Sequence, residues 1–364
     1  MKMTSSVLIG AAILLAGNAY PYGHDGHYLV GAIADQMLVG TPTAKKVKGL
    51  IGSVKLATAA TMPDEIKAWD PGGRSYKLPF EVTTNKKLNA DLEAFLHANQ
   101  TRPDCSRELR HHEYHFADVQ VFDSPTTYSA GQVGTTDHDI VHMISFCIDV
   151  LTGKQSTNNA QKITQPVALV LLVHYLGDLH QPLHVGAEYF DSAGQPVNPQ
   201  NTPGYAGDKG GNSLSLVLLD LSDTHPTHPG NLHAYWDDNA VSTAERNWAK
   251  LIKPSNPHKV ALLDMAKYLK RTLPAGWTTE PTIDPARFPV DCADEILPIA
   301  QEAHKRLSFS GIKDTGKASC PVVTAGTATA LASADYPTYA GDVVADEIQK
   351  AGHRLADLLQ VILQ

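Results

Sequence analysis

The sequence is poor in cysteine, in charge and in long apolar runs. Only four of its 364 residues are cysteines, and their spacing matches no cysteine-rich zinc motif. Charged residues make up 19% of the chain and hydrophobic residues 43%, which is typical of a globular protein with a sizeable core. The formal net charge of −8 argues against a protein that binds nucleic acid through a broad basic surface. Because no internal repeat, low-complexity tract or linker is found either, a single domain is expected.

The one conspicuous apolar run covers residues 7–16. Lys2 precedes it, and the small residues Gly17 and Ala19 follow it, so residues 1–19 are predicted to be a secretory signal peptide cleaved after Ala19. A membrane anchor is the disfavoured alternative, because the run is too short to span a bilayer comfortably. No other stretch approaches a spanning length. The mature protein is therefore expected to be secreted or periplasmic.

The cysteines fit this expectation of export. In an oxidising compartment they favour two disulfides, although the sequence does not separate the three possible pairings. Buried free thiols are the alternative. The residues concerned are Cys105, Cys147, Cys292 and Cys320.

Helical patterns dominate the rest of the chain. Apolar residues recur at helical spacing in residues 26–38, 91–97, 137–151, 165–179, 293–307 and 340–363. Thr41 and Pro42 mark the start of another helix. Strand evidence is confined to residues 212–219, and residues 191–211, rich in Gly, Pro and Asn, are expected to form a surface loop. We therefore expect one mainly α domain over residues 20–364, with at most a small β-hairpin.

The densest group of potential metal ligands lies at the end of the predicted helix 165–179. His174 and Asp178 are four residues apart, so a helix brings them to one face. They follow a continuous apolar run, in which uncompensated polar groups would be costly to bury. Pro182 ends the helix and lets His184 approach from another direction. This pattern predicts a metal site.

A second pair, His233 and Asp237, repeats the four-residue spacing and makes a polynuclear site the expectation. Further candidates are short motifs that contain His27, Asp64 and His115. Each of these motifs is weak alone, because any one of 17 histidines is more often a surface residue or a partner of a ligand. The segment around His115 lacks the histidine spacing of an HExxH metalloprotease.

Taken in order along the chain, these motifs resemble a known family. The most specific are His-x-x-Gly-Asp-x-His-Gln-Pro-Leu-His at 174–184, Asp-x-Gly-Gly-Asn at 208–212 and Asn-Leu-His-x-x-Trp-Asp at 231–237. The sequence is similar to the zinc-dependent, single-strand-preferring secreted nucleases of the mung-bean-nuclease type, whose members are also 3′-nucleotidases. The resemblance runs from residue 22 to residue 356. It implies a largely α-helical fold, shared with zinc-dependent phospholipase C, and three zinc ions at the bottom of a cleft.

The resemblance also implies the zinc ligands. One ion would be held by Asp64, His115, His174 and Asp178. A second would share Asp178 and be held by His27 and by the amine and carbonyl of Tyr22 as the N-terminal residue. The third would be held by His184, His233 and Asp237. Histidine and carboxylate ligands without thiolate suit zinc, and the open coordination positions are typical of a catalytic site.

Catalytic and substrate-binding roles follow from the same resemblance. Asp64, Lys67 and Asp178 would be catalytic, with Lys67 near the phosphate; a solvated surface lysine is the alternative. Phe116 would stack on a base and Asp118 would accept hydrogen bonds from its edge, which would favour unpaired strands. A core phenylalanine and a surface acid are the alternative reading. The products would carry a 5′-phosphate.

The N-terminus departs from the family pattern. The family begins its mature chain with tryptophan, and this sequence has Tyr22 at that position. Cleavage directly before Tyr22 would leave Pro21 next to the cut, which signal peptidase disfavours. Cleavage after Ala19 would leave Tyr20 and Pro21 ahead of Tyr22 and remove its free amine.

The leading prediction is a monomeric, secreted zinc endonuclease and 3′-nucleotidase that acts on single-stranded DNA, RNA and 3′-nucleotides. A zinc-dependent phospholipase C is the first alternative, although such enzymes usually have glutamate where this chain has Asp237. An exported zinc-binding protein without catalysis is the second. A nucleic-acid-binding module without hydrolysis is disfavoured by the acidic composition.

Overall fold

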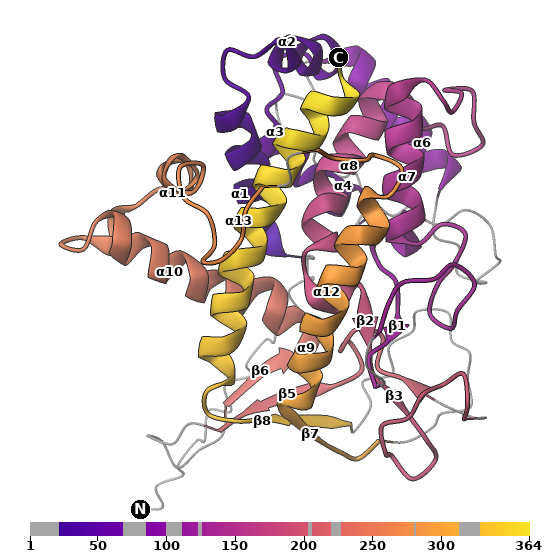
Figure 1. Ribbon diagram of the computed structural model, residues 1–364, viewed down its shortest axis with the longest axis vertical. Helices are drawn as coiled ribbons and strands as arrows, with labels where there is room; N and C mark the ends of the chain where they lie inside the picture. The colour runs from indigo at the N-terminus through magenta and orange to yellow at the C-terminus, as the bar shows by residue number, and fades with distance from the viewer. Residues whose placement is uncertain are drawn as a thin grey trace, which may run out of the picture.

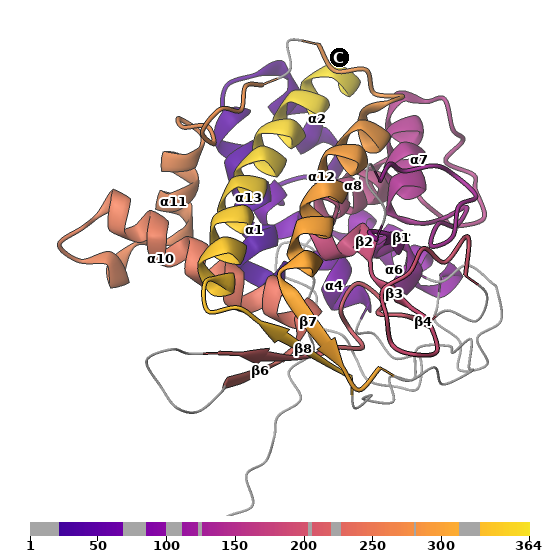
Figure 2. The ribbon, with the colours of Figure 1, turned by 60° about the horizontal axis from the view of Figure 1, so that its bottom comes forward.

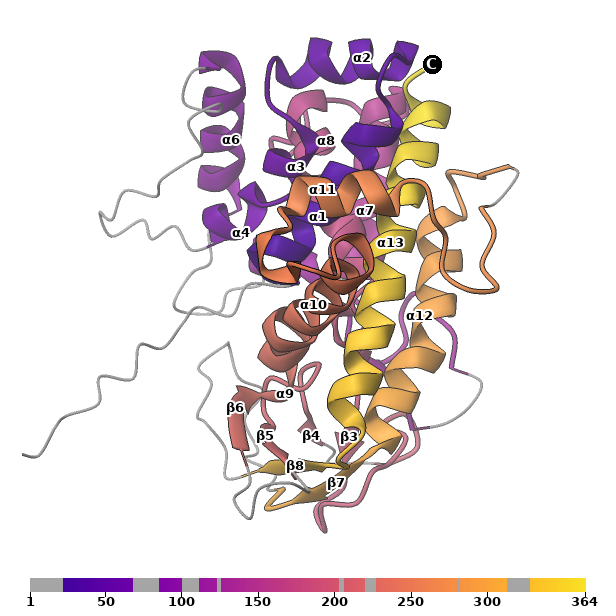
Figure 3. The ribbon, with the colours of Figure 1, turned by 90° about the vertical axis from the view of Figure 1, so that its left-hand side faces the viewer.

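A computed structural model describes residues 22–67, 85–99, 111–122, 126–202, 206–219, 227–279, 282–312 and 328–364. Helices form most of this part of the chain, so the prediction of a mainly α fold is confirmed (Figure 1). The larger helices are α1 (Gly23–Met37), α7 (Ile140–Thr152), α8 (Gln165–Leu179), α12 (Phe288–Lys305) and α13 (Tyr336–Ile362). Helices α12 and α13 run beside each other along the long axis (Figures 1 and 3), and α8 lies at the centre of the core.

Helix α8 is buried on every side because its sequence is apolar all round. Every residue from Pro166 to Leu179 is buried. A helix of this kind belongs in a core rather than on a surface. It packs against α7, whose first turn is capped by Asp139: its carboxylate accepts hydrogen bonds from the backbone N–H groups of Val141 and His142, each at 3.1 Å. The predicted helix over residues 165–179 is confirmed.

The remaining helices surround this core. They are α2 (Pro42–Ile51), α3 (Leu56–Ala59), α4 (Met62–Lys67), α6 (Lys86–Ala98), α9 (Leu232–Ala234), α10 (Val241–Ile252) and α11 (Leu262–Leu269), with the single turns η1 (His111–His115), η2 (Pro182–His184), η3 (Tyr235–Ala240) and η4 (Pro257–Lys259). Thr41 caps α2 as predicted, because its hydroxyl accepts from Ala44 N at 3.2 Å. Helix α6 begins before the predicted residue 91, because Asn85 accepts from Leu88 N at 3.1 Å and caps it.

The β structure is more extensive than the expected hairpin. Strand β5 (Ser215–Leu218) lies within the predicted segment, but it belongs to a four-stranded sheet with β6 (Thr227–Asn231), β7 (Leu307–Ser310) and β8 (Thr329–Ala332) in the order β6-β5-β8-β7. Strands β5 and β8 are parallel, and the other pairs are antiparallel. Figure 2 shows this sheet at one end of α12 and α13. Strands β5 and β8 pair although they lie more than 100 residues apart, a long-range relationship that local sequence patterns do not reveal.

Two small ladders lie nearer the predicted ligands. Strand β1 (Val119–Gln120) pairs in parallel with β2 (Gly186–Ala187), and β3 (Tyr189–Phe190) pairs antiparallel with β4 (Ala206–Gly207). The first ladder joins the segment that follows η1 to the segment that follows η2. It therefore holds two of the predicted metal-binding motifs side by side.

The cysteines do not pair as two disulfides. Cys147 is a free thiol buried in α7, so the expectation that all four cysteines form bridges is wrong in this structure. Cys105 and Cys320 lie outside the described residues, as do the predicted signal peptide and Pro21. Among the described helices, none is both long enough and apolar enough to cross a membrane.

Candidate metal centre

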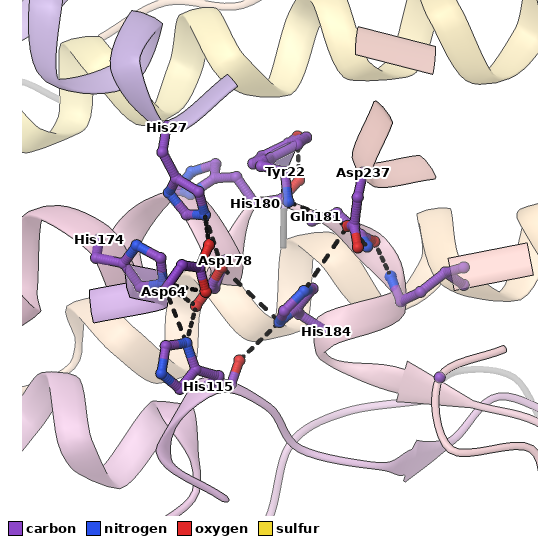
Figure 4. A network of polar contacts seen from close by, with 12 residues as sticks. Tyr22, His27, Asp64, His115, His174, Asp178, His180, Gln181, His184 and Asp237 are labelled. Carbon is purple, nitrogen blue, oxygen red and sulfur yellow. Dashed lines mark hydrogen bonds and ion pairs between the residues drawn. The ribbon is translucent and has the colours of Figure 1, made fainter. Parts of the chain in front are cut away.

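The centre is built on the last turns of α8. His174 and Asp178 are fully buried on one face of this helix, with His174 Nε2 at 3.1 Å from Asp178 Oδ2. His27 reaches them from α1: its ring stacks on that of His174 with centroids 3.9 Å apart, and its Nε2 lies 3.1 Å from Asp178 Oδ1. Figure 4 shows both imidazoles and the carboxylate converging from their two helices. The prediction that the four-residue spacing places His174 and Asp178 on one face of the helix is therefore confirmed.

Two more side chains complete this half of the centre. His115, at the end of η1, brings Nδ1 to 2.9 Å from Asp178 Oδ2 and 3.0 Å from His174 Nε2. Asp64, from α4, lies with Oδ1 at 3.7 Å from His174 Nε2 and Oδ2 at 4.0 Å from His27 Nε2. His27 and His115 thus reach the carboxylate of Asp178 from separate segments, and Asp64 faces His27 and His174 beside it.

The second half of the centre is formed by His184, His233 and Asp237. His184 Nε2 lies 3.9 Å from Asp237 Oδ1, and His233 Nε2 lies 3.5 Å from Asp237 Oδ2. The two imidazole rings are 4.7 Å apart. His184 Nδ1 is also 3.9 Å from Asp178 Oδ1, so the two halves adjoin.

Within the described residues, the ligand atoms form three groups. Each group offers one atom per residue, all within 4.8 Å of one another. They are His27–His174–Asp178, Asp64–His115–His174 and His184–His233–Asp237. These groups contain eight of the nine residues predicted as metal ligands, and the ninth is Tyr22.

Backbone carbonyls fix the orientation of three of the imidazoles. His174 Nδ1 donates to Ala60 O at 2.6 Å, and His233 Nδ1 donates to Gly210 O at 2.7 Å. His184 Nδ1 donates in the same way to the carbonyl of His115 at 2.7 Å. A carbonyl only accepts, so each of these nitrogens carries the proton and Nε2 is left with a lone pair for a metal.

The donor set fits a metal better than it fits a closed hydrogen-bond network. His27 Nε2, Asp178 Oδ1 and Asp237 Oδ2 are buried and make no hydrogen bond with any described residue. Burial raises the pKa of Asp237 well above its usual range. Burial also disfavours charge on Asp178, but the neighbouring imidazoles of His174, His184 and His27 outweigh it and hold its pKa well below the usual range. Buried polar atoms of this kind need a partner, and a divalent cation would supply one.

Tyr22 brings the start of the described chain into the centre. Its side chain is fully buried, its OH donates to His180 O at 2.9 Å, and its backbone N–H donates to Asp237 Oδ1 at 3.0 Å (Figure 4). The next residue, Gly23, has φ +51°, and a Cβ there would lie 2.9 Å from Asp237 O. Glycine is therefore needed for this close approach. The nitrogen of Tyr22 contacts Asp237 rather than Asp178, the carboxylate with which it was predicted to share an ion.

The predicted substrate-binding residues lie beside the centre. Phe116 is half-buried, with its ring 6.0 Å from that of His112. The backbone of Asp118 is fixed at both ends, because its N–H donates to Gly134 O at 2.8 Å and its carbonyl accepts from Tyr189 OH at 2.7 Å. Burial, with the charge of Asp208 adding to it, raises the pKa of Asp118 to about 7. Lys67 is the last residue of α4, and its side chain is outside what the structure describes.

Several supporting residues were not identified from the sequence. Gln181 donates to Asp237 Oδ1 at 2.9 Å. Asp208 and His304 form a buried pair at 2.9 Å beside the turn at residues 208–213, which also carries Gly210 O, the acceptor for His233. Gln181 lies inside the motif at 174–184 and Asp208 inside the motif at 208–212, so these motifs could have pointed to both residues. His304 lies 96 residues from its partner Asp208, and no sequence motif marks it. His180 Nε2 lies 3.0 Å from a guanidinium nitrogen of Arg354.

The fold and the site together define a mainly α protein with three buried groups of histidine and aspartate that could hold metal ions. A model of the S1/P1 nuclease family matches residues 22–364, and the chain belongs to that family. Among curated proteins, it is similar to Endonuclease 3 of Arabidopsis thaliana, with 25% identity over 73% of this chain and 67% of the relative. Endonuclease 5 of the same plant is 22% identical over 73% of this chain and 69% of the relative. Endonuclease 2 is 26% identical, but the alignment spans only 37% of this chain and 35% of that protein.

Proposed function

We propose that this protein is a zinc-dependent endonuclease that hydrolyses single-stranded DNA and RNA to products with 5′-phosphates, and that it also acts as a 3′-nucleotidase. The observation that carries the proposal is the set of three buried histidine and aspartate groups in a chain of the S1/P1 nuclease family. Nitrogen and carboxylate donors without thiolate suit Zn²⁺, and three or four protein ligands leave positions for water and substrate.

Three zinc ions would be held by the residues described above. Asp64, His115, His174 and Asp178 would hold one ion. Asp178, His27 and Tyr22 would hold a second, and His184, His233 and Asp237 a third. Asp178 is suited to a shared role because its two oxygens face different histidines: Oδ1 lies 3.1 Å from His27 Nε2, and Oδ2 lies 2.9 Å from His115 Nδ1.

Bound zinc would lower the pKa of water toward neutrality and stabilise negative charge on the phosphate. The chain's own residues supply orientation. Asp64 and Asp178 both present carboxylate oxygens to His174 Nε2, at 3.7 Å and 3.1 Å, and the carbonyl of Ala60 keeps that imidazole in one tautomer. Lys67 would contact the phosphate as a cation.

Phe116 and Asp118 would select an unpaired base. Phe116 directly follows the ligand His115, so a base stacked on its ring would lie beside the metal centre. Asp118, with its backbone fixed by Gly134 and Tyr189, would hydrogen-bond to the base edge. A base inside a duplex has no free face for stacking, which would make single strands the preferred substrate.

Tyr22 would contribute its amine once the preceding residues are removed. An amide nitrogen is a poor metal ligand, whereas a terminal amine is a good one, and the nitrogen of Tyr22 is already inside the centre. The family match begins at the same residue, which supports a mature chain that starts there. Export after removal of residues 1–19, with further trimming to Tyr22, is part of this proposal, as are a monomeric state and a secreted or periplasmic location.

The test is a comparison of substrates. Zinc-loaded protein that begins at Tyr22 would be assayed on single-stranded DNA, duplex DNA, RNA, a 3′-nucleotide and phosphatidylcholine, before and after EDTA and after zinc is restored. We expect zinc-restorable cleavage of the single strands and of the 3′-nucleotide, and its loss in Asp178→Asn but not in the exposed control Asp342→Asn. Release of lipid head groups alone would assign the protein to the phospholipases. Bound zinc without turnover of any substrate would support a zinc-binding protein instead.

A further inference from the structure

We propose that Gly177 is a positioning residue that holds His27 in place for metal binding and so decides whether the ion at His27 is retained. The inference rests on the proposed zinc centre. Gly177 lies on α8 between the two ligands His174 and Asp178, and it is buried. It has no side chain that could touch a metal or a substrate. Its role would be to leave space.

The space that Gly177 leaves is filled by the ring of His27. A Cβ built on Gly177 would lie 2.7 Å from His27 Nδ1 and 3.0 Å from its Cε1. The contact is close because α1 crosses α8 at this point, and because the ring of His27 lies flat on that of His174, with an interplanar angle of 16°. The absence of a Cβ is therefore what allows the imidazole to lie against the helix.

On its Nδ1 side, this imidazole is positioned by packing and not by a hydrogen bond. His174, His184 and His233 each donate from Nδ1 to a backbone carbonyl. His27 Nδ1, in contrast, makes no hydrogen bond with any described residue. Its ring is held instead between Gly177 and the face of His174. A change in the shape of this surface would therefore move His27 without breaking a hydrogen bond at Nδ1, and it would shift Nε2 from its position 3.1 Å from Asp178 Oδ1.

The movement would be large on the scale of metal coordination. Ordinary contacts begin at 3.4 Å, so a Cβ at 2.7 Å would push the ring away by about 0.7 Å. Metal–ligand distances tolerate only about 0.2 Å. The ring has little room to adjust, because it is fully buried and already 3.9 Å from the ring of His174. We therefore expect Gly177→Ala to withdraw His27 Nε2 from its ion.

The other two ions should be less affected. The groups Asp64–His115–His174 and His184–His233–Asp237 do not contain His27. Alanine also favours a helix over glycine, so the substitution should not weaken α8 through its backbone. The expected defect is local to one ion.

The experiment measures zinc per chain after dialysis at a fixed free zinc concentration, by mass spectrometry of the metal. It compares the wild type, Gly177→Ala, His27→Ala and the double variant. Gly49→Ala is the matched control, because Gly49 is also helical but exposed, with nothing within 4 Å of its Cβ position. We expect Gly177→Ala and His27→Ala each to lose one zinc ion, the double variant to lose no more than either, and Gly49→Ala to lose none.

This non-additivity separates a positioning role from general damage. Full zinc content in Gly177→Ala, or a further loss in the double variant, would overturn the inference. If Gly177→Ala folds poorly, His27→Ala should restore folding by removing the clash, and failure to do so would also overturn it. A wild-type protein that binds no zinc would refute the proposed function itself. A wild type and a Gly177→Ala variant that bind zinc equally would refute only the role of Gly177.

Discussion

His184 Nδ1 donates a hydrogen bond to the backbone carbonyl of His115 over 2.7 Å, although the two residues are 69 positions apart in the chain. The reverse connection runs from the N–H of Ala117 to His184 O at 2.8 Å, and the β1–β2 ladder begins directly after it. A proposed ligand in one of the three groups is thus oriented by the backbone that carries a proposed ligand in another. These hydrogen bonds and the ladder join the two halves of the centre.

Replacing His184 should remove one ion. His184→Asn deletes the Nε2 donor of the group that contains His233 and Asp237, and we expect one fewer bound zinc ion per chain. Activity on single-stranded DNA should fall by more than about 100-fold, the upper end of what loss of a mere supporting residue causes. His258→Asn, on an exposed turn, is the control. Unchanged zinc content in His184→Asn would show that this residue is not a ligand.

Gln181 should tune zinc affinity without being a ligand. Its side-chain amide donates to Asp237 Oδ1 at 2.9 Å and orients that carboxylate toward His184 and His233. Gln181→Leu keeps the size of the side chain but removes the donor, so zinc should bind about 10–100-fold more weakly at this group. Competition with a zinc chelator would measure the affinity. Gln360→Leu, an exposed glutamine of α13, should have no effect, and equal affinities for the two variants would contradict the assigned role.

The buried pair Asp208–His304 should make stability depend on pH. Burial lowers the pKa of His304, but the charge and hydrogen bond of Asp208 outweigh it and raise the pKa from 6.5 to about 9. A raised pKa in the folded state stabilises the protein below about pH 6.5, and this contribution is lost as the pH rises through 9. A rise in pKa from 6.5 to about 9 is worth at most about 3–4 kcal/mol, since each pKa unit corresponds to about 1.36 kcal/mol.

The test compares wild type with His304→Gln in the absence of metal, by urea unfolding at pH 6 and at pH 10. The wild type should be the more stable at pH 6, and the difference should shrink at pH 10. The same substitution at the exposed His258 gives the baseline. A difference that stays constant with pH would show that His304 is not protonated in the folded protein.

Metal removal should destabilise the fold. Without zinc, buried atoms such as Asp178 Oδ1 and Asp237 Oδ2 have no hydrogen-bond partner among the described residues. Zinc that binds only the folded state stabilises it by about 2.7 kcal/mol per site when its free concentration is 100 times Kd. Thermal unfolding with and without EDTA should therefore show a lower Tm without metal. Asp178→Asn should show a smaller zinc-dependent change in Tm than Asp342→Asn, and identical changes would argue against Asp178 as a ligand.

The sequence predicted those parts of the molecule that depend on local periodicity. The apolar run before His174 predicted a buried helix, and the four-residue spacing to Asp178 predicted that both side chains share a face, as they do. The cap at Thr41 is likewise a local relationship, read directly from the residue type that precedes Pro42. In each of these cases the prediction depends only on residues within about one helical turn of each other.

Long-range relationships were less accessible. The meeting of His27, Asp64 and His115 at α8 was implied by resemblance to a family, because no local pattern brings residues from three separate segments together. The pair Asp208–His304 was missed because nothing near residue 304 distinguishes its histidine from the others. The parallel pairing of β5 with β8 was also missed, because the paired residues lie over 100 positions apart in the chain and no local pattern connects them. The free thiol of Cys147 shows that expected export alone was a poor guide to disulfide pairing.

The most direct test of the central claim is a crystal structure of the zinc-loaded protein that begins at Tyr22, with anomalous scattering recorded at the zinc absorption edge. We expect three anomalous peaks, one at each of the groups His27–His174–Asp178, Asp64–His115–His174 and His184–His233–Asp237. Each peak should lie about 2.0–2.2 Å from the ligand nitrogen and oxygen atoms. A structure with no peak at these side chains, obtained from crystals grown in zinc, would contradict the assignment of the site.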